Sequence, residues 1–165
     1  MSEIIFACKK CGTCCKNLLE DIDGNEAGLL LTVKERKFFP SKMISPRFAI
    51  GTRKPDKTIL YQLNVKNCPF ITESNECRMY DKRPLICRQF PYKSEGYVSA
   101  KCPTFHNVRR GTEIEFSLSE IEAKEKLLRH ANNQIKKFHK ERLCGWFFDL
   151  RTNQWVATDL KIIPI

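Results

Sequence analysis

Residues 8–15 read Cys8-Lys9-Lys10-Cys11-Gly12-Thr13-Cys14-Cys15. Four sulfurs within one or two turns of chain leave little room for apolar neighbours, so core packing does not explain them. Thiolates two residues apart in a turn can converge on one metal ion, and this spacing recurs in zinc and iron–sulfur sites. Gly12 suits a tight turn because glycine adopts positive φ without a Cβ clash. The stretch therefore predicts a cluster of metal ligands.

A second block of four cysteines lies between residues 68 and 102. Together with the first four, these thiols are enough for two four-sulfur sites or one polynuclear cluster. Since adjacent side chains tend to diverge, we expect Cys14 and Cys15 to serve two sites, or one of them to bridge two metals. Cys144, at the end of a predicted helix, is expected to be a buried structural thiol. The predicted ligands are Cys8, Cys11, Cys14, Cys15, Cys68, Cys77, Cys87 and Cys102.

The spacing of the first three cysteines favours iron–sulfur over zinc. Cys8, Cys11 and Cys14 match the first part of the ferredoxin-type four-iron (4Fe-4S) motif, whose remaining cysteine is followed by proline. Both Cys68-Pro69 and Cys102-Pro103 offer that dipeptide. Zinc remains the alternative, because zinc sites also take ligands from distant segments.

Length and composition fit one soluble globular domain over residues 1–165. The chain has 42% apolar and 29% charged residues, which is typical of neither disordered nor membrane proteins. No run approaches the roughly 18 apolar residues of a membrane-spanning helix, and the residues before Cys8 form no signal peptide. We expect a cytoplasmic protein that does not contact a membrane. In that reducing compartment the nine cysteines are thiols or ligands and not disulfides.

The formal charge of +10 counts every thiol as neutral. Eight thiolates around two divalent metals would lower it by about four, to about +6. Nucleic-acid binding, which Arg109-Arg110 and Lys136-Lys137 could support, is therefore disfavoured. The basic residues around the sulfurs either offset thiolate charge or form a phosphate-binding surface; they are Lys9, Lys10, Lys16, Arg78, Lys82, Arg83 and Arg88.

Short strands are predicted from apolar segments separated by turn residues, and residues 20–26 are predicted to be a loop. The segments 48–50 and 58–63 flank a breaker run at residues 51–56. The expected strands are 48–50, 58–63 and 97–100, with a closing hairpin of 146–148 and 155–157.

Two capping boxes predict helices. Thr32 with Glu35 begins a short helix over residues 33–39, which Pro40 ends, and Ser117 with Glu120 begins a long amphipathic helix over residues 117–143. The apolar face of the long helix is predicted to consist of Ile121, Leu128, Ala131, Ile135 and Phe138. Off this face, His130 and His139 are expected at the surface. We expect an α+β fold: a small cysteine-rich, metal-stapled domain with short strands and one long helix.

Three segments resemble the CxxCxxCC cysteine-cluster family: Cys8-x-x-Cys11-Gly12-x-Cys14-Cys15, Cys68-Pro69-Phe70, and Cys77-x-x-Tyr80-x-x-Arg83-Pro84-x-x-Cys87-Arg88-x-Phe90-Pro91. That family is described as a zinc- or iron-chelating domain, and flagellin lysine methylases carry a related pattern. The resemblance implies a cysteine-cluster metal-binding region over residues 6–102. It also implies an alternative, cluster-dependent methyl transfer to a protein lysine. Against this alternative, the chain lacks a glycine-rich nucleotide turn and the C-x3-C-x2-C spacing of radical enzymes.

The segment around Cys87 predicts a helical turn that begins at Pro84, ends at Pro91 and projects Cys87 inward. Arg83 and Arg88 could donate hydrogen bonds to cluster sulfurs or grip a carboxylate or phosphate, so we predict them to be cofactor-binding. Metal ions are the expected partners, with a protein partner or substrate as a further option. Whether the chain is an enzyme, or whether the metal only staples a loop-rich region, is left open.

Overall fold

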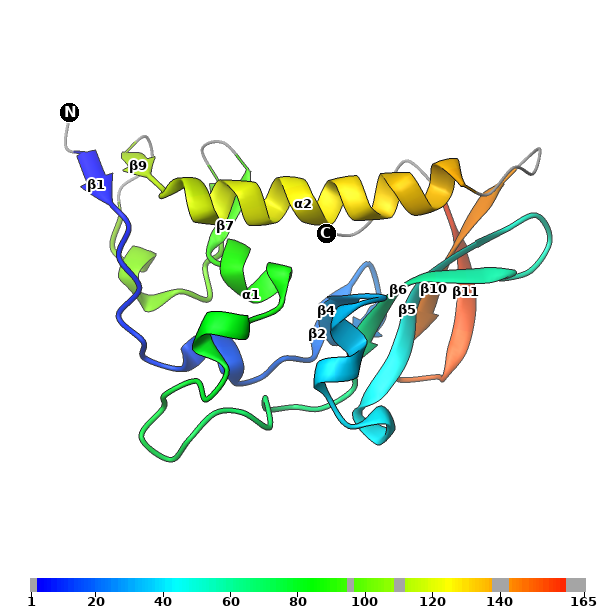
Figure 1. Cartoon of the computed structure of the whole chain (residues 1–165), viewed down its shortest axis with the longest axis horizontal. Helices are drawn as coiled ribbons and strands as arrows, with labels where there is room; N and C mark the ends of the chain where they lie inside the picture. Colours follow the sequence, from blue (N-terminus) through cyan, green and yellow to red (C-terminus); the bar gives the residue numbers. More distant parts are fainter. Residues whose placement is uncertain (1–2, 95–96, 109–111, 138–142, 160–165) are drawn as a thin grey trace. The chain divides into compact units, whose positions relative to one another are not determined.

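The computed structural model describes residues 3–94, 97–108, 112–137 and 143–159 (Figure 1). Its mixture of short strands and one long helix confirms the α+β class. The chain forms two compact units, each built from two segments. Unit 1 comprises Met1–Asn17 and Asn67–Lys126, and unit 2 comprises Leu18–Lys66 and Leu127–Ile165. The single domain over residues 1–165 stays a prediction.

Unit 2 contains a five-stranded sheet in which all neighbouring strands are antiparallel. The segments 48–50 and 58–63 lie in two of its strands, and the closing hairpin forms two more, so these predictions are confirmed. In sheet order the strands are β11 (Gln154–Thr158), β10 (Cys144–Asp149), β5 (Ile44–Gly51), β6 (Lys57–Leu63) and β4 (Leu29–Thr32).

Register places large apolar side chains together in the core of unit 2. Phe48 pairs with Leu60 on one side and with Phe147 on the other. Phe48 and Leu60 are fully buried and Phe147 nearly so. Directly paired residues point to the same face of a sheet, so these three side chains form a continuous apolar layer.

A buried polar network lies beside this layer. The Gln62 side chain accepts from the backbone N–H of Gly28 at 2.8 Å and donates to the carbonyls of Pro46 and Phe148 at 2.7 and 3.1 Å. Arg47 donates to Gln62 at 3.1 Å. Burial lowers the pKa of Arg47 to about 10, which still leaves the guanidinium charged at neutral pH. Gln62 thereby links several segments of unit 2.

Residues 20–26 form most of a hairpin, so the predicted loop is wrong. Strands β2 (Glu20–Ile22) and β3 (Asn25–Ala27) pair antiparallel. Asp23 and Gly24 between them have φ of 51° and 83°, the positive values that a two-residue type I′ turn requires. The Asp23-Gly24 dipeptide was the signal for this hairpin.

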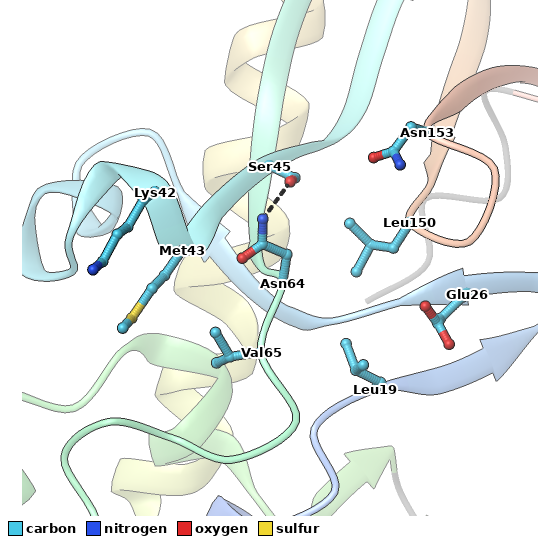
Figure 2. Close-up of a pocket in the computed structure, with 9 residues that line it drawn as sticks. All are labelled: Leu19, Glu26, Lys42, Met43, Ser45, Asn64, Val65, Leu150 and Asn153. Atoms are coloured by element: carbon cyan, nitrogen blue, oxygen red, sulfur yellow. Dashed lines mark hydrogen bonds between the residues drawn. The ribbon is translucent and has the colours of Figure 1, made fainter.

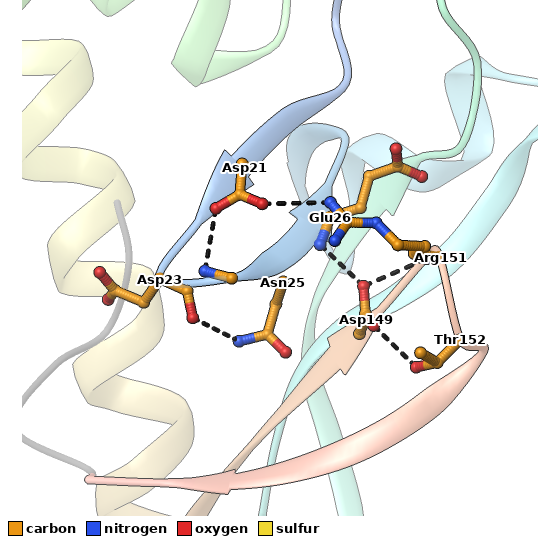
Figure 3. Close-up of polar contacts among 8 residues, drawn as sticks. Asp21, Asp23, Asn25, Glu26, Asp149, Arg151 and Thr152 are labelled. Atoms are coloured by element: carbon orange, nitrogen blue, oxygen red, sulfur yellow. Dashed lines mark hydrogen bonds and ion pairs between the residues drawn. The ribbon is translucent and has the colours of Figure 1, made fainter.

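Polar contacts join this hairpin to the turn between β10 and β11 (Figure 3). The Asp149 carboxylate accepts from the backbone N–H of Glu26 at 2.7 Å, the backbone N–H of Arg151 at 3.1 Å and the Thr152 hydroxyl at 2.7 Å. Arg151 also pairs with Asp21 at 3.1 Å. These contacts explain the polar, turn-rich character of residues 20–26 without a ligand.

The capping box of Thr32 and Glu35 is confirmed. Glu35 accepts from the backbone N–H and the hydroxyl of Thr32, each at 2.8 Å, and Thr32 accepts from the backbone N–H of Glu35 at 3.3 Å. The element that follows is a 3-10 helix, η2 (Glu35–Phe38), which is shorter than predicted, and η3 (Ser41–Met43) comes next.

The long helix is α2 (Leu118–Lys136). It begins as predicted but ends earlier, because Lys137 is no longer helical; residues 138–142 of the predicted range, with Phe138 and His139, lie outside the described residues. Leu128, predicted to be on the buried face, is 38% exposed, whereas Leu127 is fully buried. The buried residues Ala123, Leu127 and Ala131 recur at steps of four, so the apolar face is rotated by about one residue from the prediction.

His130 on this helix is half-buried, contrary to the surface position expected. Burial lowers its pKa, and a hydrogen bond to the backbone of Ile59 opposes that shift. The ring is thus part of the packing of unit 2.

Unit 1 has short elements only, apart from its share of α2. A cluster of aromatic rings packs within it: Phe6 lies 5.6 Å from Phe105 and 5.5 Å from Phe116, and Tyr92 lies 5.2 Å from Phe116. The predicted strand 97–100 is present only as a two-residue strand. The elements are β1 (Glu3–Ile5), η1 (Thr13–Cys15), η4 (Tyr80–Lys82), α1 (Leu85–Gln89), β7 (Tyr92–Ser94), β8 (Tyr97–Val98), η5 (Pro103–Phe105) and β9 (Glu113–Glu115).

Candidate metal centre

The loop that carries the first four cysteines is pinned against the segment that follows Cys68. Gly12 is buried with φ of 72° and precedes η1. A Cβ at this position would lie 2.8 Å from atoms of Asn75 and Ile71, so only glycine fits. The backbone N–H of Cys68 donates to the carbonyl of Cys15 at 2.8 Å. These contacts place Cys15 beside Cys68.

Three thiols influence one another's pKa. The Cys15 side chain is hydrogen-bonded to Cys14 and to Cys68. In each case this interaction is the main cause that lowers the pKa, to about 7 for Cys14 and to about 7 for Cys68. The same two bonds raise the pKa of Cys15 far above its ordinary value, ahead of burial. The single proton of the Cys15 thiol can be donated to only one of these neighbours at a time, and both neighbours ionise more readily than an ordinary thiol. The 3-10 turn η1 carries both Cys14 and Cys15, and the expectation that they serve two sites, or that one of them bridges two metals, stays a prediction.

Cys77 and Cys87 lie near these three thiols. Burial is the main cause that raises the pKa of each, and the charges of Cys14 and Cys68 raise both further. Cys87 is carried by α1, with Pro84 as its N-cap. The predicted helical turn after Pro84 is confirmed, and it brings Cys87 into electrostatic range of Cys14 and Cys68.

Two cations act on the same thiols. Arg83 is held by a hydrogen bond from its Nε to the carbonyl of Tyr80 at 2.8 Å and lies 3.7 Å from the centroid of the Tyr80 ring. Its charge lowers the pKa of Cys14, Cys77 and Cys87, in each case as a smaller cause. Lys101, whose Nζ donates to the carbonyl of Asn17 at 2.6 Å, also lowers the pKa of Cys14. Arg88, which was predicted together with Arg83 to bind the cofactor, is exposed.

The remaining predicted ligands differ in their surroundings. Cys102 is buried and follows Lys101 directly. Cys8 and Cys11 are exposed. The Thr13 hydroxyl, 3.3 Å from the sulfur of Cys11, is the main cause that lowers the pKa of Cys11, while the charge of Cys14 acts in the opposite direction. The ninth cysteine, Cys144, is exposed at the start of β10, so the prediction of a buried thiol is wrong.

The chemistry of the inner thiols, Cys14, Cys15, Cys68, Cys77 and Cys87, fits a thiolate-bound metal. Two thiolates on one zinc ion at about 2.3 Å lie about 3.8 Å apart in a tetrahedral site, close to the contact distance of hydrogen-bonded thiols. As the side chains stand, no group of three or more His, Cys, Asp and Glu in the described ranges is arranged to hold a metal ion. Side-chain rotations and loss of the Cys15 proton would have to accompany binding.

Unit 2 has a separate pocket that the sequence did not indicate (Figure 2). It has a volume of about 470 Å³. Lys42 and Glu26 lie at opposite ends, and Asn64 donates to the hydroxyl of Ser45 at 2.9 Å. Its lining contains no cysteine and consists of Leu19, Glu26, Lys42, Met43, Ser45, Asn64, Val65, Leu150 and Asn153. The residues belong to no motif, so no sequence signal could have located it.

Comparison with known families identifies the class of protein. A family model named CxxCxxCC, with the description "Putative zinc- or iron-chelating domain", matches residues 7–114. This match covers most of the chain, and the protein belongs to that family. No curated protein and no solved structure matches the chain. In the described part of the chain, no helix is both long and apolar enough to span a membrane.

Proposed function

We propose that the chain binds an iron–sulfur cluster through its inner thiols, with Cys102 as a further ligand. The observation that carries this proposal is the hydrogen bond from the backbone N–H of Cys68 to the carbonyl of Cys15 at 2.8 Å, which brings together cysteines from distant parts of the sequence. Cysteines that only pack behave as small apolar groups, whereas Cys14, Cys15 and Cys68 influence one another's pKa, and Arg83 and Lys101 act on Cys14, as expected of ligands. The metal chelation of the family supports the same assignment.

The number of thiols favours a polynuclear centre. One tetrahedral ion takes four ligands, whereas five thiols influence one another here and Cys102 lies directly after a lysine that acts on Cys14. Two of the proposed ligands, in Cys68-Pro69 and Cys102-Pro103, precede proline as the last cysteine of the ferredoxin-type motif does, which adds to the preference for iron and sulfide. Zinc is the second candidate, which the description of the family favours equally.

The chain's own residues would hold and shield the group. A bound cluster would supply one-electron transfer or a structural cross-link. Arg83 and Lys101 would offset the negative charge of the thiolates, and the Tyr80 carbonyl and ring fix the position of Arg83. Arg83 would thereby tune the stability of the oxidised and reduced forms.

Metal and sulfide analysis of protein purified without exposure to air tests this proposal. We expect iron and acid-labile sulfide in comparable amounts and a broad visible absorption. A colourless protein that contains only zinc would replace the cluster by the second candidate. A folded protein that contains neither metal would refute both.

A matched pair of cysteine variants tests the ligand assignment. We expect Cys68→Ser to lose most of the metal, because Cys68 contacts Cys15. Cys144→Ser removes an exposed thiol outside the matched region and should keep the metal content of the wild type. Equal metal content in the two variants would remove Cys68 from the ligand set.

A further inference from the structure

The walls of the pocket in unit 2 are tied together by backbone hydrogen bonds. The N–H of Leu150 donates to the carbonyl of Glu26 at 2.9 Å, and the N–H of Asn64 donates to the carbonyl of Met43 at 2.9 Å. All four of these residues line the pocket. Their bonds hold the walls in place without a ligand, as in binding sites that are largely pre-formed. The pocket is therefore a fixed feature of the fold, although its walls come from distant parts of the sequence.

The polar side chains of the lining are available to a ligand. Among the described residues, the Lys42 ammonium, the Glu26 carboxylate and the Asn153 side chain have no hydrogen-bond or ion-pair partner. The charge of Glu26 acts on Arg151 only at longer range, because Arg151 pairs with Asp21 at 3.1 Å. A ligand can bind to these groups without breaking a bond inside the protein.

The lining separates its two charges by polar and apolar groups. Lys42 lies at one end and Glu26 at the other, with Ser45 and Asn64 between them (Figure 2). The Ser45 hydroxyl accepts from the Asn64 amide at 2.9 Å, a bond that leaves the hydroxyl hydrogen and the amide oxygen for a ligand. The apolar part of the lining consists of Leu19, Met43, Val65 and Leu150. A matching ligand has an anionic and a cationic end, with apolar surface and hydrogen-bonding groups between them.

We infer that this pocket binds a short peptide of about two or three residues with both termini free. Its amino terminus lies at Glu26 and its carboxylate at Lys42. Peptide N–H and C=O groups match the hydroxyl and amide side chains between the two charges, which an alkyl chain would leave unused. The volume of about 470 Å³ is in the range that holds drug-sized molecules. The lining contains no cysteine, so the inference stands apart from the proposed metal function.

Isothermal titration calorimetry of the purified protein with leucyl-leucine and leucyl-alanyl-leucine tests the inference. We expect at least one of the two peptides to bind with a dissociation constant between about 10 µM and 1 mM, as ligands of this size do. Acetylation of the amino terminus or amidation of the carboxylate should each weaken binding about two- to fivefold, because ion pairs near the surface contribute modestly. N-methylation of the peptide nitrogen should weaken binding by a similar factor, since it removes one hydrogen bond.

Variants that remove one charge assign each end of the peptide. Glu26→Gln should weaken binding of the free peptide about two- to fivefold and abolish the effect of acetylation, and Lys42→Gln should do the same for amidation. Glu73→Gln and Lys37→Gln are charge-matched controls, because both side chains are exposed and lie outside the lining. These two variants should bind as wild type does. Equal effects of the pocket variants and the controls would show a general response to charge and would contradict the inference.

Methyl NMR of the full chain locates the bound peptide. We expect the methyl resonances of Leu150 and Val65 to shift during the titration. Those of Leu118, an exposed leucine of unit 1, should not shift. Leu150→Ala should weaken binding about threefold or more, because it removes apolar surface from the wall. Circular dichroism of each variant should match wild type, which would exclude unfolding as the cause of weaker binding.

Four results would overturn the inference. One is the absence of both heat and methyl shifts with either peptide at about 5 mM, which exceeds the expected dissociation constants. Another is equal binding of the free, acetylated and amidated peptides, since the charged ends would then recognise nothing. A third is binding of 6-aminohexanoate as tight as that of both peptides, which would assign the pocket to α,ω-amino acids. The fourth is a set of methyl shifts confined to Leu118, which would place the peptide outside the pocket.

Discussion

The two units of the molecule bury different kinds of side chain. In unit 2 the buried set is a conventional apolar core, with Phe48, Leu60 and Leu127 at zero exposure. In the described part of unit 1 the buried apolar residues are Cys68, Cys102, Phe105 and Ala123, joined by Pro84 and Pro91. Half of those four are candidate metal ligands. The strands of unit 1 are also at most three residues long.

This difference indicates two sources of stability. Small structures that bury little apolar surface generally need a disulfide, a metal or a partner to stay folded. Unit 2 buries enough apolar surface on its five-stranded sheet to stay folded without such help. Unit 1 has the aromatic cluster around Phe6 and Phe116, but its segments 8–17 and 67–77 are joined mainly through loops that carry cysteines. The metal should therefore matter to unit 1 far more than to unit 2.

The largest effect we predict is loss of structure in unit 1 on metal removal. Structural zinc contributes about 10–16 kcal/mol of apparent binding free energy in small zinc domains, which equals or exceeds the stability of a typical domain. Hydrogen exchange with mass spectrometry, before and after chelation without air, should show loss of amide protection over residues 67–94. The strands β5, β6 and β10 should keep theirs.

Protection that returns when metal is restored would exclude irreversible damage by the chelator. Unchanged exchange over residues 67–94 after complete metal loss would show that unit 1 folds without metal. Equal loss of amide protection in β5 and β6 would contradict the proposed difference between the units, because the apolar core of unit 2 would then depend on the metal as well.

The second-largest predicted effect is that of a substitution in the apolar core of unit 2. Phe48→Ala should lower the free energy of unfolding by about 3–5 kcal/mol, since it removes a fully buried ring between Leu60 and Phe147. Both tryptophans of the chain, Trp146 and Trp155, lie in β10 and β11. Urea unfolding followed by tryptophan fluorescence therefore reports on unit 2 directly.

The matched control for this substitution is Phe38→Ala. Phe38 is 41% exposed, and its truncation should change the stability of unit 2 by less than about 0.5 kcal/mol. Equal effects of the two substitutions would show that the buried layer contributes no more than a surface ring.

The sequence predicted unit 2 better than unit 1, for a physical reason. The strand pattern around Phe48 and the capping box at Thr32 are local signals, and both are confirmed. The hairpin at Asp23-Gly24 had an equally local signal that the polar composition obscured. The shift from Leu128 to Leu127 on α2 shows the limit of periodicity, because several faces of that helix carry apolar residues and tertiary packing selects one.

The candidate site could be predicted as a set of residues but not as an arrangement. The spacing identifies every cysteine of the inner thiols, and the family match supports their metal chemistry. The spacing does not reveal that the backbone of Cys68 bonds to that of Cys15, nor that Cys8 and Cys11 are exposed. Those features depend on contacts between segments more than fifty residues apart, such as Cys15 with Cys68 and Gly12 with Asn75.

The smallest effect concerns the polar link within unit 2 and depends on pH. The Thr152 hydroxyl, followed by the backbone N–H groups of Glu26 and Arg151, lowers the pKa of Asp149 below its ordinary value. The folded state therefore favours the carboxylate, and its contribution is complete above the unfolded pKa of about 3.9 and is lost as pH falls through the lower folded pKa. Asp149→Asn should cost about 1–2 kcal/mol at pH 7, because the amide presents hydrogens to some of these donors.

The pH profile distinguishes this explanation from a general loss of packing. In urea unfolding followed by tryptophan fluorescence, the deficit of Asp149→Asn should shrink as pH falls below about 4, where wild type also loses the carboxylate. Asp23→Asn removes an exposed carboxylate from the adjoining hairpin, and asparagine tolerates the positive φ of the turn, so this control should show little deficit at any pH. A deficit of Asp149→Asn that stays constant down to pH 2.5 would mean that Asp149 acts through its shape alone, and the polar link would then carry no charge-dependent stability.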